Sequence, residues 1–153
     1  MCVIVDANVA ARVFGDPPAG QYAGLLKWLL GPKGGLAYGG KNAEELARVR
    51  GAIWAIRQLR LAGRAYLADK SAVVERTQAL HRAEACVSND EHVVALAQVS
   101  GARTLCSEDR DLHEDFTNRA LVRDPRGKVY QAGPNHEQLL RHTSGCPARR
   151  ARR

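Results

Sequence analysis

The stretch SNDEHVVALAQVSGARTLCSED, residues 88–109, decides the fold. It opens with a serine followed three residues later by a glutamate and an apolar run, and this capping-box pattern predicts a helix that begins at Ser88. Gly101 ends the helix, and residues 103–106 then form a short strand that leads into an acidic turn. A helix followed by a strand is the unit from which parallel sheets are built.

The rest of the chain repeats this alternation. Apolar runs predict strands at residues 2–5, 35–38 and 65–68, of which the first and last should be buried. Helical spacing of apolar residues predicts helices at 7–14, 21–30, 41–61, 71–85 and 136–142, and turn residues predict a hairpin at 120–131. Together these elements predict an α/β fold with a mainly parallel central sheet flanked by helices.

Length and composition predict a single folded unit. The chain has 153 residues with 45% hydrophobic residues, so we expect one domain over residues 1–143 and a basic flexible tail over 144–153. No stretch approaches the roughly 20 apolar residues that a membrane span needs, and we expect a cytoplasmic protein without membrane contact. Free thiols are expected at the four widely spaced cysteines, Cys2, Cys86, Cys106 and Cys146.

Charge is distributed unevenly along the chain. Residues 68–118 carry ten acidic and five basic side chains, although the whole chain has 23 basic and 16 acidic ones. The flanking segments 41–67 and 119–153 are both basic. A surface adapted only to nucleic acid would not concentrate carboxylates in this way, so the acidic stretch indicates a site that uses them.

Carboxylates follow two of the predicted strands. Asp6 ends the first strand, and Asp109, with Asp111 two residues later, follows the strand at 103–106. Ligands of parallel sheets bind beyond the carboxyl ends of the strands. Asp90 lies in the first turn of its helix, where the helix dipole favours the ionised form. We therefore expect Asp6, Asp90 and Asp109 to converge.

The predicted helix at 41–61 offers a fourth carboxylate. At about 100° per residue, Glu44 falls on the outer side with Arg48 at i+4, the spacing of a surface ion pair. Glu45 falls on the inner side, together with Val49, Ile53 and Ile56. Glu45 is therefore the candidate, and Glu44 is the fallback.

Carboxylates that converge without partners repel one another, and at least one of them should take up a proton. A hard divalent cation relieves this repulsion. Oxygen ligands without paired His or Cys select Mg²⁺ or Mn²⁺ rather than zinc. Combined with basic segments that can hold a polyanion, such a site indicates phosphodiester chemistry.

Several segments, in this order and spacing, resemble the PIN-domain nucleases, the fold of many toxin ribonucleases of bacterial toxin–antitoxin pairs. They are VIVDANV, GGKNAEEL, SNDEHVVALAQVSGARTLCSEDRDL and PRGKVY, within residues 2–131. The resemblance implies an Mg²⁺- or Mn²⁺-dependent endoribonuclease with an RNA substrate and an antitoxin as a candidate partner. The basic tail and the predicted hairpin depart from small toxin members.

The resemblance also implies a role for individual residues. It makes Asp6 the central metal ligand, with further ligands at Glu45 or Glu44, Asp90 and Asp109, and an additional acid at Asp111. Two residues would orient ligands or water, namely Asn8 and Ser107.

Basic residues near the expected site are candidates for binding RNA. Lys41 lies beside Gly39 and Gly40, where a chain could approach a phosphate, or is simply an exposed lysine at a helix start. Arg57 and Arg60 either cover the core with their aliphatic stems, which we favour, or line a groove. Because aromatic residues are only 5% of the chain, recognition should be electrostatic or by shape.

Other residues have simpler interpretations. Asp69 is expected to cap the helix that follows it, and Asp115 to be solvated. His92 is either a proton carrier or, as we favour, an ordinary partly buried histidine. A homodimer patch is suggested by Leu26, Leu29 and Leu30.

Two other functional classes share parts of this sequence pattern. A phosphatase of the HAD type also places an Asp after its first strand, but requires a second acid two residues later, where this chain has Asn8. A non-catalytic nucleic-acid-binding or partner-binding module on the same fold is the other alternative.

Overall fold

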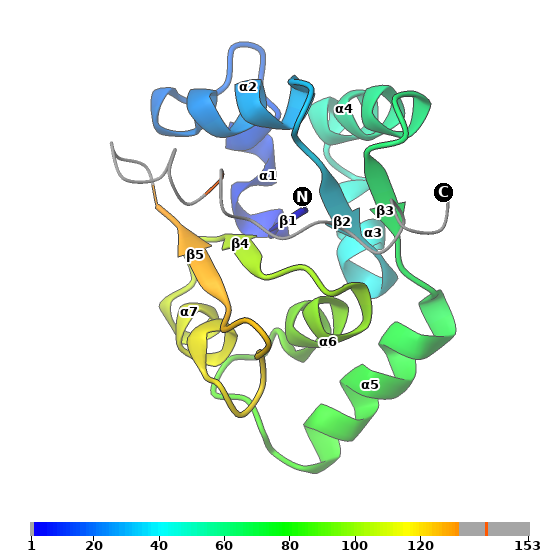
Figure 1. Ribbon diagram of the computed structural model, residues 1–153, viewed down its shortest axis with the longest axis vertical. Coiled ribbons are helices and arrows are strands. Elements are labelled where there is room, and N and C mark those ends of the chain that lie inside the picture. The colour runs from blue at the N-terminus through cyan, green and yellow to red at the C-terminus, as the bar shows by residue number, and fades with distance from the viewer. Residues whose placement is uncertain (1, 132–139, 141–153) are drawn as a thin grey trace.

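The computed structural model describes residues 2–131 and Leu140. Their strands form one five-stranded sheet in the order β3-β2-β1-β4-β5 (Figure 1), and every neighbouring pair is parallel. The predicted α/β fold with a parallel central sheet is therefore confirmed. The strands are β1 (Val3–Val5), β2 (Leu36–Tyr38), β3 (Ala65–Leu67), β4 (Thr104–Cys106) and β5 (Lys128–Tyr130).

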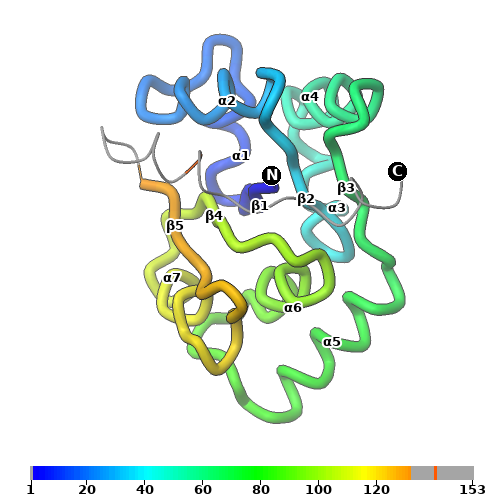
Figure 2. The backbone as a smooth tube through the Cα atoms, viewed as in Figure 1, coloured from blue at the N-terminus to red at the C-terminus, as the bar shows by residue number. Residues whose placement is uncertain are grey.

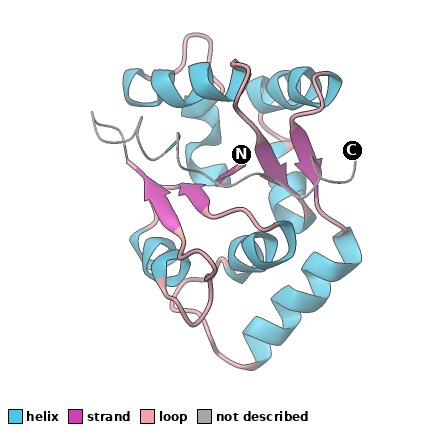
Figure 3. Cartoon of the chain, in the orientation of Figure 1, coloured by secondary structure: helices cyan, strands magenta, loops and turns pink. Residues whose placement is uncertain are grey.

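Helices separate the strands and cover the sheet (Figure 3). The predicted helices at 7–14, 21–30 and 71–85 are present with ends shifted by a few residues. The described elements are α1 (Ala7–Val13), the 3₁₀ helix η1 (Gly20–Tyr22), α2 (Ala23–Leu30), α3 (Gly40–Leu46), α4 (Arg50–Leu61), α5 (Lys70–Arg82), α6 (Glu91–Ser100) and α7 (Arg110–Thr117).

The sheet has a separate apolar core on each face. Successive side chains of a strand point to opposite faces, so Val3 and Val5 pack with α1, α2, α3 and α4, whereas Ile4 packs with α5, α6 and α7. All three residues are fully buried. Figure 1 shows α1, α2 and α4 on one side of the sheet and α5, α6 and α7 on the other. This two-sided burial explains why the β1 sequence is continuously apolar.

The single helix predicted at 41–61 is wrong, because the chain breaks into α3 and α4. Val49 is extended, with φ −104° and ψ 113°, and precedes α4. Two residues later, a Cβ added to Gly51 would lie 1.8 Å from the carbonyl oxygen of Phe14. The break thus lets α4 pack directly on the backbone that ends α1, a contact that helical periodicity cannot predict.

The helix predicted to begin at Ser88 begins later. Asp90 is the N-cap of α6, and the Ser88 hydroxyl accepts a hydrogen bond from the Asp90 N–H at 3.3 Å. Ser88 therefore supports the residue before the helix and is not its cap. The strand at 65–68 is also less buried than predicted, because β3 is an edge strand with Leu67 56% exposed.

The hairpin predicted at 120–131 is wrong as well. Residues 119–126 form turns, and β5 pairs with β4 in parallel, so that Thr104 lies opposite Lys128. Because α7 carries the chain back between the two strands, a parallel pairing replaces the antiparallel one. The predicted helix at 136–142, apart from Leu140, and the tail at 144–153 lie outside the described residues.

The structure also bears on the expectations about the cysteines and about membrane-spanning segments. Cys86 and Cys106 are free thiols, but Cys2 is disulfide-bonded, so the expectation of free thiols is wrong at that position. In the part of the chain that the structure describes, no helix combines the length and the apolar character that a membrane crossing requires.

The contact at Gly51 makes a testable prediction about stability. Gly51→Ala should lower the free energy of unfolding by about 2 kcal/mol, because its methyl group would overlap backbone that cannot easily move. Gly20→Ala is the control, since an added Cβ there meets nothing within 4 Å. Urea denaturation of both variants measures the difference, and equal stability would contradict the packing described here.

Candidate functional site

The order of the strands defines where a ligand should bind. From β1 the chain winds to β2 and β3 on one side, and later returns to β4 and β5 on the other side, as Figure 2 follows by colour. The connections diverge between β1 and β4, and such a switch point opens a crevice at the carboxyl ends of the strands. Val5 lies opposite Cys106 there, and the Asp6 N–H donates to the Cys106 carbonyl at 2.9 Å. Asp6 and Ser107 consequently lie side by side.

Ser107 holds the carboxylate of Asp6. Its hydroxyl donates to Asp6 Oδ2 at 2.8 Å, and it lies 3.5 Å from Asn8 Oδ1. Burial is the main reason why the pKa of Asp6 is raised, and the Ser107 hydrogen bond acts in the opposite direction. The contacts that an orienting role for Ser107 requires are therefore present, whereas the contact of Asn8 is at the limit of a hydrogen bond.

The loop after β4 places two more acids. The Asp109 N–H donates to Ser107 Oγ at 3.1 Å, and Asp109 Oδ1 accepts from the N–H groups of Asp111 and Leu112. Asp109 is thus the N-cap of α7, joined to Asp6 through Ser107. Asp111 is exposed in the first turn of that helix.

Asp90 is the most perturbed carboxyl group of the site. Burial raises its pKa to about 7, aided by a hydrogen bond with Asp109 and by the negative charges of Asp6, Asp109 and Glu45. The structure therefore brings three other carboxyl groups, from separate elements, within electrostatic reach of Asp90. One of them takes up a proton near neutral pH, which is how crowded carboxylates relieve repulsion.

Glu45, rather than Glu44, lies inside the site. Glu45 Oε1 is 2.9 Å from His92 Nε2, whereas the Glu44 side chain is 64% exposed and forms an ion pair with Lys70 at 3.9 Å. Glu45 was selected on the assumption of one continuous helix over residues 41–61, and that helix does not form, because α3 ends at Leu46. Glu45 reaches the site because α3 contacts α6, which carries His92.

His92 is almost fully buried, at 4% exposure. Burial lowers its pKa, as does the nearby charge of Lys41, while Glu45 acts in the opposite direction. His92 is therefore neutral at physiological pH. Glu45 Oε1 and His92 Nε2 face each other at 2.9 Å, and neither atom has another hydrogen-bond partner among the described residues.

Sequence reasoning missed Asn42. Its amide Nδ2 donates to the Val5 carbonyl at 3.0 Å, while its Oδ1 is buried without a hydrogen-bond partner among the described residues. Asn42 is 1% exposed and lies four residues before the buried Leu46. That helical spacing is the signal that could have identified it as inward-facing.

Glu108 fixes the loop between Ser107 and Asp109. Its carboxylate accepts hydrogen bonds from Tyr22 Oη at 2.6 Å and Arg12 Nη2 at 2.7 Å, and another from Gln21. The hydrogen bond from Arg12 is the main reason why the pKa of Glu108 is lowered. Burial and the bond to Glu108 raise the pKa of Tyr22 to about 12. These contacts tie the loop to α1 and η1.

The predicted RNA-binding residues lie on two helices, α3 and α4. Lys41 is exposed and close enough to His92 for its charge to lower the pKa of that histidine. Arg57 and Arg60 are exposed on α4 and line a hollow of about 570 Å³ together with apolar side chains. Their guanidinium groups are thus accessible, and their role in binding stays a prediction.

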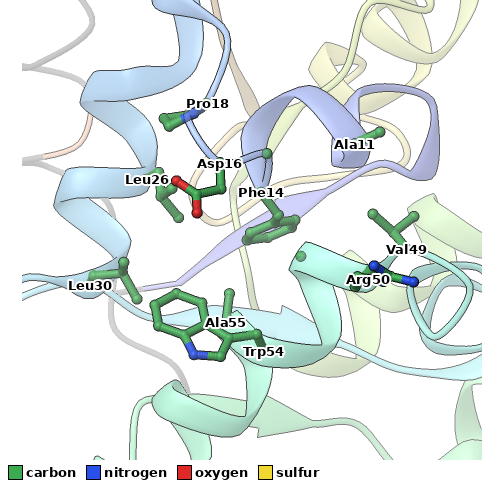
Figure 4. Close-up of a pocket in the computed structure, with 12 residues that line it drawn as sticks. Ala11, Phe14, Asp16, Pro18, Leu26, Leu30, Val49, Arg50, Trp54 and Ala55 are labelled. Atoms are coloured by element: carbon green, nitrogen blue, oxygen red, sulfur yellow. The ribbon is translucent and has the colours of Figure 1, made fainter.

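A second hollow, of about 650 Å³, lies between α1, α2 and α4 (Figure 4). Phe14, Leu30 and Trp54 surround it, and Trp54 is 55% exposed. None of the predicted acidic ligands lines this hollow.

The homodimer patch predicted at Leu26, Leu29 and Leu30 is wrong for Leu29, which is fully buried in the core.

The donor set of the acidic site fits a hard divalent cation in its chemistry. Asp6, Glu45, Asp90 and Asp109 supply carboxylate oxygens, and Oδ1 of Asn42 is buried without a hydrogen-bond partner among the described residues. Within residues 2–131 and 140, however, no three His, Cys, Asp or Glu side chains are arranged as a set that could hold a metal ion. A cation would therefore require these side chains to turn toward a common point.

Fold and site together define an α/β protein with an all-parallel sheet and a cluster of carboxylates at its switch point. No protein-family model matches the sequence, and no curated protein matches it. Among solved structures, the chain is similar to a chain in the crystal structure of VapBC2 from Rickettsia felis bound to a DNA fragment from the VapBC2 promoter. The two chains share 14% identity, with a TM-score of 0.46. The match covers 84% of this chain and 97% of that one.

The raised pKa of Asp90 predicts how stability depends on pH. The pKa of Asp90 is 3.8 in the unfolded chain and about 7 in the folded protein. Its contribution to the free energy of unfolding is therefore fully present below pH 3.8 and is lost as the pH rises through about 7. Asp90→Asn should therefore be more stable than the wild type at about pH 8, by about 1 kcal/mol after allowing for partial exposure. At about pH 3 the two should be equal.

Thermal denaturation of both proteins in EDTA, across this pH range, provides the measurement. A wild type as stable as Asp90→Asn at alkaline pH would show that the carboxylates do not crowd.

Proposed function

We propose that this protein is an Mg²⁺- or Mn²⁺-dependent endoribonuclease. The observation that carries the proposal is the gathering of Asp6, Glu45, Asp90 and Asp109 at the switch point, where the pKa of Asp90 is raised to about 7. Such crowding is costly in the free protein, and a divalent cation would remove the cost. The resemblance to PIN-domain nucleases supports the same conclusion.

The four carboxylates would hold the cation, with Asp6 in the centre. When bound, Mg²⁺ or Mn²⁺ would lower the pKa of a water molecule, and its own positive charge would stabilise the scissile phosphate. Ser107 keeps Asp6 oriented through its 2.8 Å hydrogen bond. His92 lies 2.9 Å from Glu45 and has a pKa lowered by burial, so a role as proton carrier would start from its neutral form.

Basic side chains would bind the RNA backbone. Lys41 lies near His92 at the edge of the carboxylate cluster, and Arg57 and Arg60 extend the positive surface along α4. Phosphate contacts of this kind give affinity without strong sequence preference and weaken as salt increases. From the resemblance, we extend the proposal to a toxin that an antitoxin protein would neutralise.

One observation favours a second candidate, a nucleic-acid-binding module that does not cut. The carboxyl groups of the described residues are not arranged as a ready set of three metal ligands. Such a module would bind RNA through the same basic residues without metal-dependent cleavage. A cleavage assay separates the two candidates.

Replacement of the central carboxylate tests the proposal. Asp6→Asn should abolish Mg²⁺-dependent cleavage of a labelled RNA, because the amide cannot bind the cation as a carboxylate does. The fold should persist, since Asn can still accept the hydrogen bond from Ser107. Asp124→Asn is the matched control, because the Asp124 side chain is 92% exposed and should leave cleavage unchanged.

Expression of wild type and Asp6→Asn in bacteria, followed by sequencing of new RNA 5′ ends, extends the test to the toxin role. Growth arrest with the wild type alone supports it. Metal-dependent cleavage that persists in purified Asp6→Asn would exclude the assigned site.

The neighbouring glutamates on α3 allow a paired comparison. Glu45→Gln should lower the cleavage rate by at least about tenfold, because it removes a carboxylate of the cluster. Glu44→Gln should change the rate less than twofold, since this side chain is 64% exposed and pairs with Lys70. Single-turnover kinetics at saturating Mg²⁺ measure both, and the opposite ranking would assign the ligand to Glu44.

A further inference from the structure

We propose that Asp115 is a positioning residue that sets the separation between the carboxylates of Asp90 and Asp109. The inference rests on the proposed function, because these two side chains matter as ligands of one cation. Asp115 was expected to be solvated, and it is instead 1% exposed. It makes no contact with the proposed reacting groups and acts through the backbone.

Both oxygens of the Asp115 carboxylate hold the loop between α5 and α6. Oδ1 accepts from the Val87 N–H at 2.8 Å, and Oδ2 accepts from the Ser88 N–H at 2.9 Å. Hydrogen bonds from backbone N–H groups to a buried carboxylate are stronger than those between neutral groups. The loop is therefore fastened to α7 immediately before Asp90.

The contact continues from the loop to Asp90. The Ser88 hydroxyl accepts from the Asp90 N–H at 3.3 Å, and the Asp90 carbonyl accepts from the Val93 N–H at 2.9 Å as α6 begins. Asp90 thus lies between a fixed loop and a fixed helix. Its backbone is linked to the Asp115 carboxylate through Ser88, which bonds both.

The other end of the same helix places Asp109. Asp109 caps α7, and Asp115 lies six residues later, about 9 Å along a helix. Leu112 and Phe116 are fully buried and anchor α7 to the core. One rigid helix therefore carries Asp109 at its start and the anchor of the Asp90 loop in its second turn.

The attachment of the Asp90 loop to α7 opposes the electrostatic repulsion between the carboxylates of the site. Asp90 and Asp109 share a hydrogen bond, and the charges of Asp6 and Glu45 act on Asp90 as well. A loop free to move would separate these groups. With Asn at position 115, one oxygen still accepts, but the amide NH₂ faces the second backbone N–H and the loop must shift.

Mn²⁺ titration of the full-length protein tests the inference independently of cleavage. Asp115→Asn should weaken Mn²⁺ binding at least about tenfold, the scale observed when groups that orient metal ligands are removed. Asp69→Ala is the control for a lost backbone contact, because Asp69 caps α5 through Ala72 N–H and lies outside the site. Its Mn²⁺ affinity should stay within about twofold of the wild type.

Two more readouts distinguish positioning from a general loss of structure. Hydrogen exchange should accelerate at the amides of Val87, Ser88 and Asp90 in Asp115→Asn, and kcat for RNA cleavage should fall while KM is unchanged. If Asp115→Asn does not fold, Ser88→Ala takes its place, since it removes only the acceptor for the Asp90 N–H. It should weaken Mn²⁺ binding to a smaller extent.

The outcomes separate this inference from the proposed function. Wild-type Mn²⁺ binding without RNA cleavage, together with weaker binding by Asp115→Asn, would overturn the function and support the positioning role. Cleavage by the wild type with unchanged Mn²⁺ affinity and kcat in Asp115→Asn would overturn the positioning role alone. A wild type that binds no Mn²⁺ would overturn both.

Discussion

The parallel pairing of β1 with β4 is the constraint on which the site depends. It places Val5 opposite Cys106, so that Asp6 and Ser107 leave the sheet together at its switch point. The 2.8 Å hydrogen bond between them follows from this register, and so does the burial that raises the pKa of Asp6. A strand shifted by one residue would turn Ile4 toward the opposite core and carry Asp6 away from its partner.

The carboxylates of the site stay together because other contacts hold their backbones. Glu108 ties the loop after β4 to α1 through Arg12 and to η1 through Tyr22, and Asp115 ties the loop before α6 to α7. These contacts lie outside the carboxylate cluster and are satisfied without a bound ion. The fold thus supports an arrangement that electrostatic repulsion alone would disperse.

Charge segregation along the chain corresponds to a division in space. The acidic segment 68–118 supplies α5, α6, β4 and α7, and with them Asp90 and Asp109. The basic segment 41–67 supplies α3 and α4, of which α3 contacts α5 and α6. The acidic residues of the middle segment therefore gather near the switch point, as the charge pattern predicted.

The sequence by itself determined the alternation of helices with strands and the burial of β1, because both follow from local periodicity. It also determined that acids lie at the ends of β1 and β4, where parallel sheets bind their ligands. Only the tertiary structure decided that the chain bends between α3 and α4, that β5 pairs in parallel, and that Asp115 is buried. Asp115 shares a helical face with Leu112 and Phe116, so its inward direction was readable, but its partners were not. Those partners are backbone N–H groups 27 and 28 residues away, and no sequence pattern specifies which distant amides a buried carboxylate will meet.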